Sequence, residues 1–341
     1  MEPTIWIDIT NVPHVHFFKP IINHFRERGY KCIFSLRDFA ETKNLFEKII
    51  GEDYLESGIH QGGNKLKKIK GLLERTIDLE NRIPNFDVAI GIGNTSSGII
   101  AKKRHKASIS FDDNDCSANW LYSPFSDLAF WPECISKNVL KKQFFKEKAI
   151  FQYHGYKENI YLADYVPNPY FLKELPFEHY VIVRPENLKA GYVNGKTSIV
   201  PPLLERLHCS GVNVLFLPRY ESDRELSAKY DNIYIPGTAI NGLDACYYSD
   251  AVLTGAGTMA REAACLGVPA VSFYAGKQLL TVDKSLIAQN KMMFSRNVEN
   301  ILTFLKAAKK TSTDLSRCKE VQQEVFDKLD SFIEQKIHHS I

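Results

Sequence analysis

Residues 250–262 read Asp-Ala-Val-Leu-Thr-Gly-Ala-Gly-Thr-Met-Ala-Arg-Glu, a pattern that predicts a strand, a glycine turn and the start of a helix. Gly255 and Gly257 allow a tight turn and a close approach of the backbone to a ligand. Thr258 is the expected N-cap. Free amides at a helix start, with the helix dipole, favour a phosphate or diphosphate. A tight strand-to-helix connection also favours Gly and Thr, so both interpretations stay open.

Apolar runs typical of strands alternate with helical stretches on both sides of this turn. In the first half we expect strands at 5–9, 31–35, 88–92 and 107–111, and helices at 16–28, 40–50, 66–83 and 96–103. In the second half we expect strands at 180–183, 212–217, 233–235, 251–254 and 270–274, and helices at 195–209, 221–229, 240–248 and 258–266. Residues 296–337 predict one short and one long polar helix. Near-continuous apolar strands between helices predict α/β domains with parallel sheets covered on both faces.

The chain length predicts two domains, because 341 residues exceed one comfortable core. Two prolines within 164–169 mark the expected linker. We therefore expect an N-terminal Rossmann-like domain at 1–165 and a C-terminal one at 166–341, with the final helices packing either there or back on the first domain. Ligands of such sheets bind at the carboxyl ends of the strands, so we expect the site in the cleft between the domains.

Composition narrows the class of protein. The net charge of +3 is too small to predict a nucleic-acid partner. The seven cysteines are widely spaced and include no Cys-x-x-Cys pair, so the sequence predicts neither a zinc site nor a disulfide framework. The first residues lack a basic signal-peptide region, and apolar runs stay well short of the ~18 residues of a membrane span. We expect a cytoplasmic protein.

The segment 255–271 resembles the donor-site segment of the GT-B superfamily, especially of MurG-like N-acetylglucosaminyltransferases and non-hydrolysing UDP-N-acetylglucosamine 2-epimerases. Its Gly turn is followed by Glu262 and then by Leu-Gly-Val-Pro. The resemblance implies two Rossmann-like domains facing across a cleft, and that Glu262 matches the glutamate that holds the nucleotide ribose. A closer similarity, to the prokaryotic family called domain of unknown function 354, rests on segments 6–18, 37–42, 217–220 and 274–277.

The loop after the first strand supplies the first catalytic candidates. His14 is similar in place to a histidine of MurG-like enzymes. A neutral imidazole there can accept the proton of an attacking hydroxyl or steady a departing diphosphate, whereas a capping hydrogen bond to the helix is the alternative. His16 is a second candidate. Asn11 stands where the MurG-like family has glycines and is a candidate for substrate contact. Asp8, at the strand end, either orients His14 or binds loop amides.

Carboxylates follow another strand, at Asp112, Asp113 and Asp115. Mutual repulsion can raise the pKa of one of them, so Asp113 and Asp115 are candidates for a general base or for binding substrate hydroxyls. The alternatives are a hard cation held through oxygens, or a cap on a helix beginning near Cys116. Asn94, in the loop 91–97, either contacts the acceptor or sugar or caps the next helix.

Basic residues at strand ends of the second domain are candidates for the diphosphate. Arg184 follows the strand at 180–183 and faintly resembles the arginine of the matching epimerase segment, Arg219 lies in Leu-Pro-Arg-Tyr, and Lys277 follows the strand at 270–274. A guanidinium can contact phosphate oxygens in a bidentate way. Surface salt bridges are the competing explanation for all three.

Three functions remain. The first is metal-independent transfer of a sugar from a nucleotide-diphosphate donor, with a UDP-sugar as the expected substrate and no tightly bound cofactor, to a glycan, lipid-linked or small hydroxyl acceptor. The others are nucleotide-sugar 2-epimerisation and nucleotide-sugar binding without turnover. The lysine-rich runs 65–70 and 141–146 predict solvated helix faces or, for a lipid-linked acceptor, a peripheral contact with the inner face of a membrane. The chain is expected to be a monomer or a homodimer.

Overall fold

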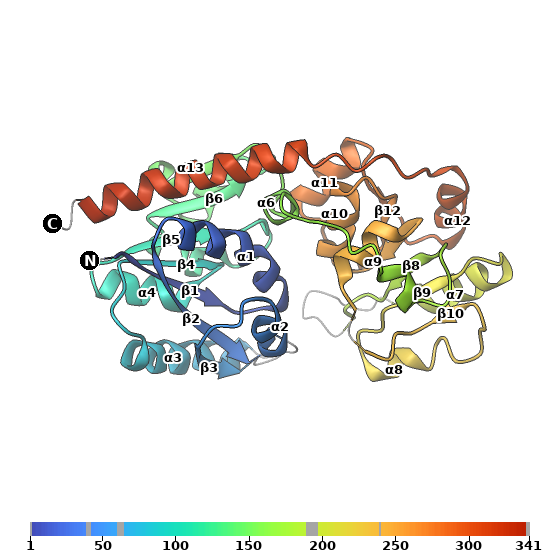
Figure 1. Cartoon of the computed structure of the whole chain (residues 1–341), viewed down its shortest axis with the longest axis horizontal. Coiled ribbons are helices and arrows are strands. Elements are labelled where there is room, and N and C mark those ends of the chain that lie inside the picture. The colour runs from blue at the N-terminus through green and yellow to red at the C-terminus, as the bar shows by residue number, and fades with distance from the viewer. Residues whose placement is uncertain (1, 39–41, 60–64, 189–196, 239, 339–341) are drawn as a thin grey trace. The chain divides into compact units, whose positions relative to one another are not determined.

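The computed structural model describes residues 2–38, 42–59, 65–188, 197–238 and 240–338, and it divides into two compact units. Unit 1 comprises Met1–Asp164 together with Ser316–Ile341, and unit 2 comprises Tyr165–Leu315 (Figure 1). Each unit is built on one parallel β-sheet with helices packed against it. The division gives the last helix to the first unit.

Unit 1 holds a seven-stranded sheet in the order β3-β2-β1-β4-β5-β6-β7. Its strands are β1 (Thr4–Ile9), β2 (Lys31–Asp38), β3 (Tyr54–Ile59), β4 (Val88–Ile92), β5 (Ala107–Phe111), β6 (Leu128–Pro132) and β7 (Ile150–Tyr153). Its α-helices are α1 (Val12–Glu27), α2 (Thr42–Ile49), α3 (Lys65–Arg82), α4 (Thr95–Lys103), α5 (Lys137–Lys142), α6 (Lys157–Leu162) and α13 (Ser316–His338). Short 3-10 turns lie at Asn119–Leu121, Ser123–Phe125 and Glu147–Ala149. The central strands β5 and β6 are buried along their whole length, as expected for a sheet covered on both faces.

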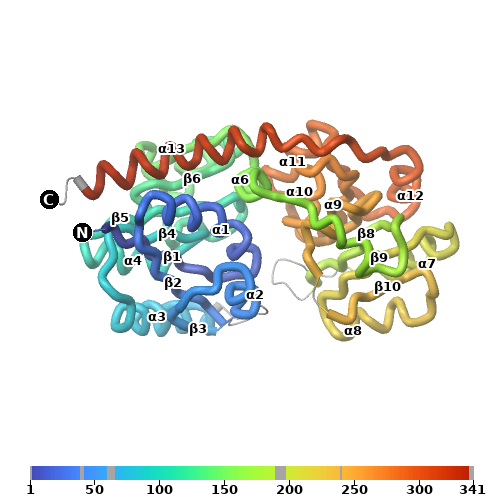
Figure 2. The backbone as a smooth tube through the Cα atoms, in the orientation of Figure 1, coloured from blue at the N-terminus to red at the C-terminus, as the bar shows by residue number. Residues whose placement is uncertain are grey.

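Helix α13 belongs to unit 1 because its apolar stripe is buried there. Val321, Val325, Leu329 and Ile333 recur every four residues and are almost fully buried. The helix packs against α6 and β7, and Figure 2 shows its red trace beside the green α6. His24 of α1 lies 2.9 Å from the Asp330 carboxylate of α13, which fixes the helix to the body of the unit.

Unit 2 holds a six-stranded sheet in the order β10-β9-β8-β11-β12-β13. Its strands are β8 (Val181–Arg184), β9 (Val214–Phe216), β10 (Ile233–Tyr234), β11 (Ala251–Thr254), β12 (Ala270–Ser272) and β13 (Met293–Phe294). Its α-helices are α7 (Val200–Cys209), α8 (Glu221–Arg224), α9 (Gly242–Tyr248), α10 (Gly257–Cys265), α11 (Thr281–Ala288) and α12 (Val298–Ala307), with a 3-10 turn at Phe171–Glu174.

Both sheets reverse their strand order at one point, between β1 and β4 in unit 1 and between β8 and β11 in unit 2. In doubly wound sheets, ligands bind outside the carboxyl ends of the strands at this reversal. The candidate sites are therefore the loops that follow β1 and β4, and those that follow β8 and β11.

Several predicted elements differ from the structure. The helix expected near Cys116 is wrong, because residues 114–118 form a turn that leads into the 3-10 turn at Asn119–Leu121. The helix expected at 16–28 begins earlier, at Val12. The predicted helices at 40–50 and 195–209 begin among residues outside the described ranges, as does part of the segment 37–42. Within the described part of the chain, the helices are too short or too polar to cross a membrane.

Candidate functional site

Helix α10 begins at the strand-order reversal of unit 2 without a side-chain cap. Its N-cap residue is Ala256, and no capping hydrogen bond from a side chain is found there in the described residues. Thr258, predicted as the N-cap, is instead the second residue of the helix, so that prediction is wrong. Thr254 Oγ1 accepts the amide of Ala256 at 2.8 Å, one step before the helix. The amides of Gly257 and Thr258 thus remain as donors for an anion at the positive end of the helix dipole.

Glycine is present at positions 255 and 257 for different reasons. A Cβ on Gly255 would lie 2.5 Å from the Cα of Glu186, so only glycine fits against the end of β8. Its amide donates to the Arg184 carbonyl at 3.0 Å. A Cβ on Gly257 would meet the Arg261 guanidinium at 2.8 Å, which is the far end of a flexible side chain. Packing alone therefore explains Gly255, whereas Gly257 is compatible with a ligand contact.

Arg184 and Glu262 share one neighbourhood. Burial and the Glu262 carboxylate raise the pKa of Cys246 on α9, and the Arg184 guanidinium opposes that rise. Both charged side chains are half-buried. The end of β8 and the second turn of α10 thus bring a cation and a carboxylate together beside the turn, as an anion with neighbouring hydroxyls requires.

Arg219 and Lys277 differ in their placement. Arg219 is half-buried, and its Nε donates to the Pro185 carbonyl at 3.4 Å, which holds it against the loop after β8. Tyr220 donates its hydroxyl to Asn187 Oδ1 at 2.6 Å and ties the same two loops together. Lys277 is exposed after β12. The structure therefore brings Arg219 to the loop that follows Arg184, whereas a contact of Lys277 with phosphate remains a prediction.

In unit 1 a buried ion pair lies at the end of β1, next to the loop that carries His14. Asp8, fully buried at the end of β1, accepts two hydrogen bonds from the Arg75 guanidinium at 2.5 and 2.9 Å. Ser35 donates to the same carboxylate at 2.6 Å. Neither predicted role of Asp8 is found, because its oxygens bind Arg75 and Ser35 rather than His14 or loop amides. Asp8 is structural support for the loop that follows it.

His14 lies in the first turn of α1. Asn11 is the N-cap, and its Oδ1 accepts the amide of Val12 at 3.0 Å. His14 Nδ1 accepts the Thr10 amide at 3.4 Å, a long contact that points the ring back toward the loop. A neutral imidazole that accepts through Nδ1 carries its proton on Nε2. The ring therefore offers a donor, not a base, on its other side.

The electrostatic surroundings of His14 keep it neutral. Burial, Lys157 and Arg37 lower the pKa of His14 from 6.5 to about 3, and the nearby Asp113 opposes them only in part. Lys157 and Arg37 were not among the residues predicted from the sequence. Lys157 begins α6 directly after β7, and it is identifiable only once that strand is recognised.

Asp112 and Asp113 are buried side by side and differ in their partners. Asp113 pairs with Lys157 at 2.9 Å. Asp112 accepts the amides of residues 113 and 114 at 2.8 and 2.9 Å and the Tyr122 hydroxyl at 2.8 Å. Burial and Asp113 raise the pKa of Asp112 to about 6, despite those hydrogen bonds and Lys157. Asp112, not chosen as a site residue from the sequence, is thus the perturbed carboxyl; its position directly after a buried strand was the available signal.

Other predicted residues lie outside this group. His16 is two residues from His14, about 200° around the helix, and burial lowers its pKa too. Asp115 contributes its backbone carbonyl to Gln143 Nε2 at 2.8 Å. Asn94 caps α4, with its Oδ1 accepting the Ser97 amide at 3.4 Å. Ligand contacts by His16, Asp115 and Asn94 remain predictions.

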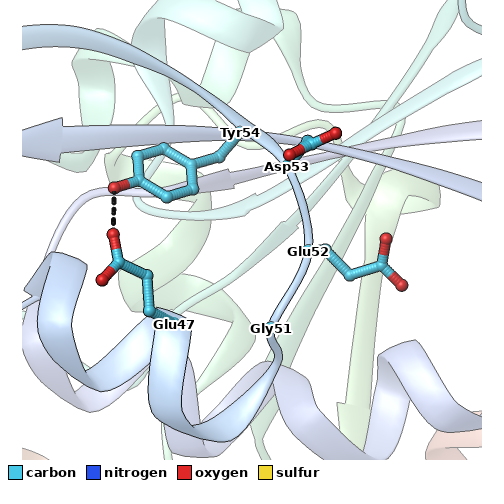
Figure 3. Close-up of a pocket in the computed structure, with 5 residues that line it drawn as sticks. All are labelled: Glu47, Gly51, Glu52, Asp53 and Tyr54. Atoms are coloured by element: carbon cyan, nitrogen blue, oxygen red, sulfur yellow. Dashed lines mark hydrogen bonds between the residues drawn. The ribbon is translucent and has the colours of Figure 1, made fainter.

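A surface hollow of unit 1 lies away from the groups around His14 and Asp113. It has a volume of about 560 Å³ and is lined by Glu47, Gly51, Glu52, Asp53 and Tyr54, just before β3. This is the amino-terminal edge of the sheet, opposite the expected ligand edge. Figure 3 shows Tyr54 bonded to Glu47, while the Glu52 and Asp53 carboxylates point away from that pair. In the ranges given above, three or more His, Cys, Asp or Glu side chains do not gather as a metal site would require.

Comparisons with solved structures identify the fold. The UDP-GlcNAc 2-epimerase of Methanocaldococcus jannaschii, solved with UDP-GlcNAc and UDP, is 16% identical with a TM-score of 0.71 over 96% of this chain and 99% of that one. The UDP-GlcNAc 2-epimerase of Neisseria meningitidis, bound to UDP-GlcNAc, is 13% identical with a TM-score of 0.67, over 96% of this chain and 100% of that one. The glycosyltransferase of kitacinnamycin is 10% identical with a TM-score of 0.65, over 98% of this chain and 99% of that one. The predicted GT-B architecture of two Rossmann-like parallel sheets is confirmed.

Sequence comparison identifies the family. The uncharacterized protein MJ0665 of Methanocaldococcus jannaschii is 30% identical over 314 residues, which cover 88% of this chain and 90% of the relative. The model of a family described as a protein of unknown function, DUF354, matches residues 3–335. The predicted family is thereby confirmed: this chain belongs to DUF354.

Proposed function

We propose that unit 2 binds the diphosphate of a nucleotide sugar at the start of α10, and that the chain transfers the sugar to a hydroxyl acceptor. One observation carries the proposal: α10 begins at the strand-order reversal with the amides of Gly257 and Thr258 uncapped by any side chain of the described residues. Such a helix start is a ready site for an anion. Arg184 and Glu262 lie together beside it.

Each group has a distinct role in this binding. The α10 amides and Arg184 contact phosphate oxygens, and Glu262 accepts hydrogen bonds from the ribose hydroxyls. Arg219 reaches the same loop through Pro185. Solved structures of the same fold carry titles that name UDP and UDP-GlcNAc, so UDP-sugars are the first ligands to test.

Unit 1 supplies the groups for the reaction. In transfer, the acceptor oxygen bonds to the anomeric carbon, the bond from that carbon to the diphosphate breaks, and the hydroxyl proton moves to a base. Asp113 is our candidate base, and its carboxylate pairs with the Lys157 ammonium at 2.9 Å. His14 Nε2–H donates a hydrogen bond to substrate rather than accepting the proton. The nucleoside diphosphate leaves as product.

A second candidate function is epimerisation at C2 of the nucleotide sugar. It is favoured by the two adjacent buried carboxyls, because Asp112 has a pKa of about 6 and stays partly protonated near neutral pH beside Asp113. One acid and one base are what removal and return of a proton require.

Product analysis separates the two. We expect incubation with UDP- and GDP-sugars to release nucleoside diphosphate only when an acceptor is present, detected by chromatography. A C2 epimer formed without nucleotide release would replace transfer by epimerisation. Binding without either product would leave only a sensor.

Nucleotide affinity tests the donor site itself. Glu262→Ala should weaken binding by about 1–3 kcal/mol, or roughly 5- to 150-fold in Kd by calorimetry. Glu205→Ala, at an exposed position of α7, is the matched control and should leave Kd unchanged. An unchanged Kd in folded Glu262→Ala would remove the donor-site assignment.

A further inference from the structure

Helix α3 carries an apolar stripe on its outer face. Leu66, Ile69, Leu73 and Ile77 are 79%, 57%, 58% and 63% exposed, and their spacing of three, four and four residues places them on one side of the helix. The inner face is already packed, with Leu79 fully buried. A surface helix normally presents polar residues outward, so α3 has a second apolar face that needs a partner.

The charges beside this stripe are divided along the helix. Lys67 and Lys70 flank its amino-terminal half, and both are exposed. Glu74 and Asp78 flank its carboxyl-terminal half. Within the helix, Lys70 lies 3.6 Å from Glu74, at the boundary between the two halves. The stripe thus has a basic end and an acidic end.

A hollow adjoins the acidic end. It has a volume of about 230 Å³ and lies between β3 and α3, and its lining includes Ile59, Gly71, Glu74 and Asp78. Ile59 is 63% exposed on β3, which is an edge strand of the sheet. An apolar wall with carboxylates beside it fits a lysine side chain, whose stem packs while its ammonium meets the acids.

We infer that the α3 stripe binds the α3 stripe of a second copy of this chain, with the two helices antiparallel about a two-fold axis that passes between Ile69 and Leu73. This arrangement places Leu66 opposite Ile77 and Lys70 opposite Glu74 of the partner. The basic end of each copy then meets the acidic end and the hollow of the other, and the surface is self-complementary as a two-fold interface requires.

The charges beside the stripe favour a second copy of the chain over a lipid bilayer as its partner. An anionic membrane would attract Lys67 and Lys70 but repel Glu74 and Asp78, which lie beside the same stripe. The 18 residues of α3 are about 27 Å long. An interface of one helix pair and a sheet edge belongs at the small end of specific interfaces, which as a class bury about 1,200 Å² or more in total, so we expect a weak, micromolar dimer.

Sedimentation velocity of the full chain from 1 to 100 µM tests the inference. We expect a monomer–dimer equilibrium, and Leu73→Asp should weaken it by about 100-fold or more because a central apolar contact becomes a buried charge. Val166→Asp makes the same kind of change at a residue of unit 2 that is 82% exposed, and should leave the equilibrium unchanged. Circular dichroism confirms that both variants are folded.

Charge reversal gives a sharper test. Lys67→Glu/Lys70→Glu and Glu74→Lys/Asp78→Lys should each be monomeric alone, because like charges then meet across the axis. Mixed together, the two variants should form a heterodimer, because both ends of the interface become complementary again.

The inference is overturned if the wild type is monomeric at 100 µM, if Leu73→Asp dimerises like wild type, or if the mixed variants stay monomeric. Binding of the monomer to phosphatidylglycerol vesicles, lost in Lys67→Glu/Lys70→Glu, would assign the stripe to a membrane instead. Both readouts are independent of nucleotide binding, so they stand whether or not the proposed enzymatic function holds.

Discussion

Replacing His14 with glutamine should make the stability of unit 1 less dependent on pH. In the folded chain, burial together with Lys157 and Arg37 lowers the pKa of His14 to about 3, whereas the ordinary value is 6.5. Between about pH 3 and 6.5, His14 therefore binds a proton in the unfolded chain but not in the folded chain. Because the unfolded state binds more protons, the contribution of His14 to the free energy of unfolding rises with pH between about 3 and 6.5 and is level above that window.

The size of the effect at pH 5.0 follows from the distance to the unfolded pKa. Between pH 6.5 and 5.0 the loss is 1.5 pH units at 1.36 kcal/mol each, or about 2 kcal/mol. Any folded-state pKa well below 5 gives the same figure, so the prediction depends on the direction and rough size of the shift. At pH 7.5 the contribution of His14 is constant.

Tryptophan fluorescence measures this unit selectively, since Trp6, Trp120 and Trp131 all lie in unit 1. Urea unfolding at pH 7.5 and 5.0 should show the wild type losing about 2 kcal/mol more than His14→Gln on acidification. His105→Asn, at an exposed position with φ 55° that asparagine tolerates, should behave like wild type. Equal losses in wild type and His14→Gln would mean that the folded imidazole protonates normally, and would remove its assignment as an Nε2–H donor.

Three further predictions concern buried groups. Asp112→Asn should have the opposite pH effect: burial raises the pKa of Asp112 from 3.8 to about 6, so the wild type should gain about 1.4 kcal/mol over the variant between pH 7.5 and 5.0 in the same urea assay. Gly255→Ala should destabilise unit 2 by about 1–3 kcal/mol, measured by circular dichroism, because the added carbon meets Glu186 backbone that has no room to move; normal stability would contradict the close approach. Asp8→Asn should cost unit 1 about 3–5 kcal/mol by tryptophan fluorescence because it leaves Arg75 buried beside a neutral group, and a loss under 1 kcal/mol would argue against a buried pair.

The fold was predictable where strands are short, apolar and central. The predicted strands at 88–92, 107–111 and 251–254 coincide with β4, β5 and β11. The edge strand β3 was not predicted, because Glu56 and Gly58 interrupt its apolar pattern and an edge strand need not be buried on both faces. β6 was also missed, although its five residues are all buried and apolar, because a proline ends it and 3-10 turns precede it.

The turn at 255–262 could be predicted from the sequence more completely than the site in unit 1. The turn is local: strand, glycines and helix start are consecutive, so their order in sequence is their order in space. The group around Asp113 is assembled by the sheet, which brings the ends of β1, β5 and β7 to one edge. Lys157 looks like an ordinary surface lysine until β7 is recognised just before it. The pKa of Asp112 depends on its burial and on the charged and hydrogen-bonding groups around its carboxylate, which only the folded chain brings together.

The two units place different kinds of groups at the same edge of the same kind of sheet. In unit 2 the groups at the start of α10 are backbone dipoles, which do not titrate and whose positions depend on Gly255 fitting against Glu186. In unit 1 they are buried ions and hydrogen-bonded carboxyls, Asp112, Asp113 and Lys157, whose protonation states depend on one another. Fixed dipoles suit a ligand that stays anionic throughout, as a diphosphate does. Coupled titratable groups suit a step in which a proton changes position. The proposed division between donor binding and chemistry therefore follows from what each edge is made of.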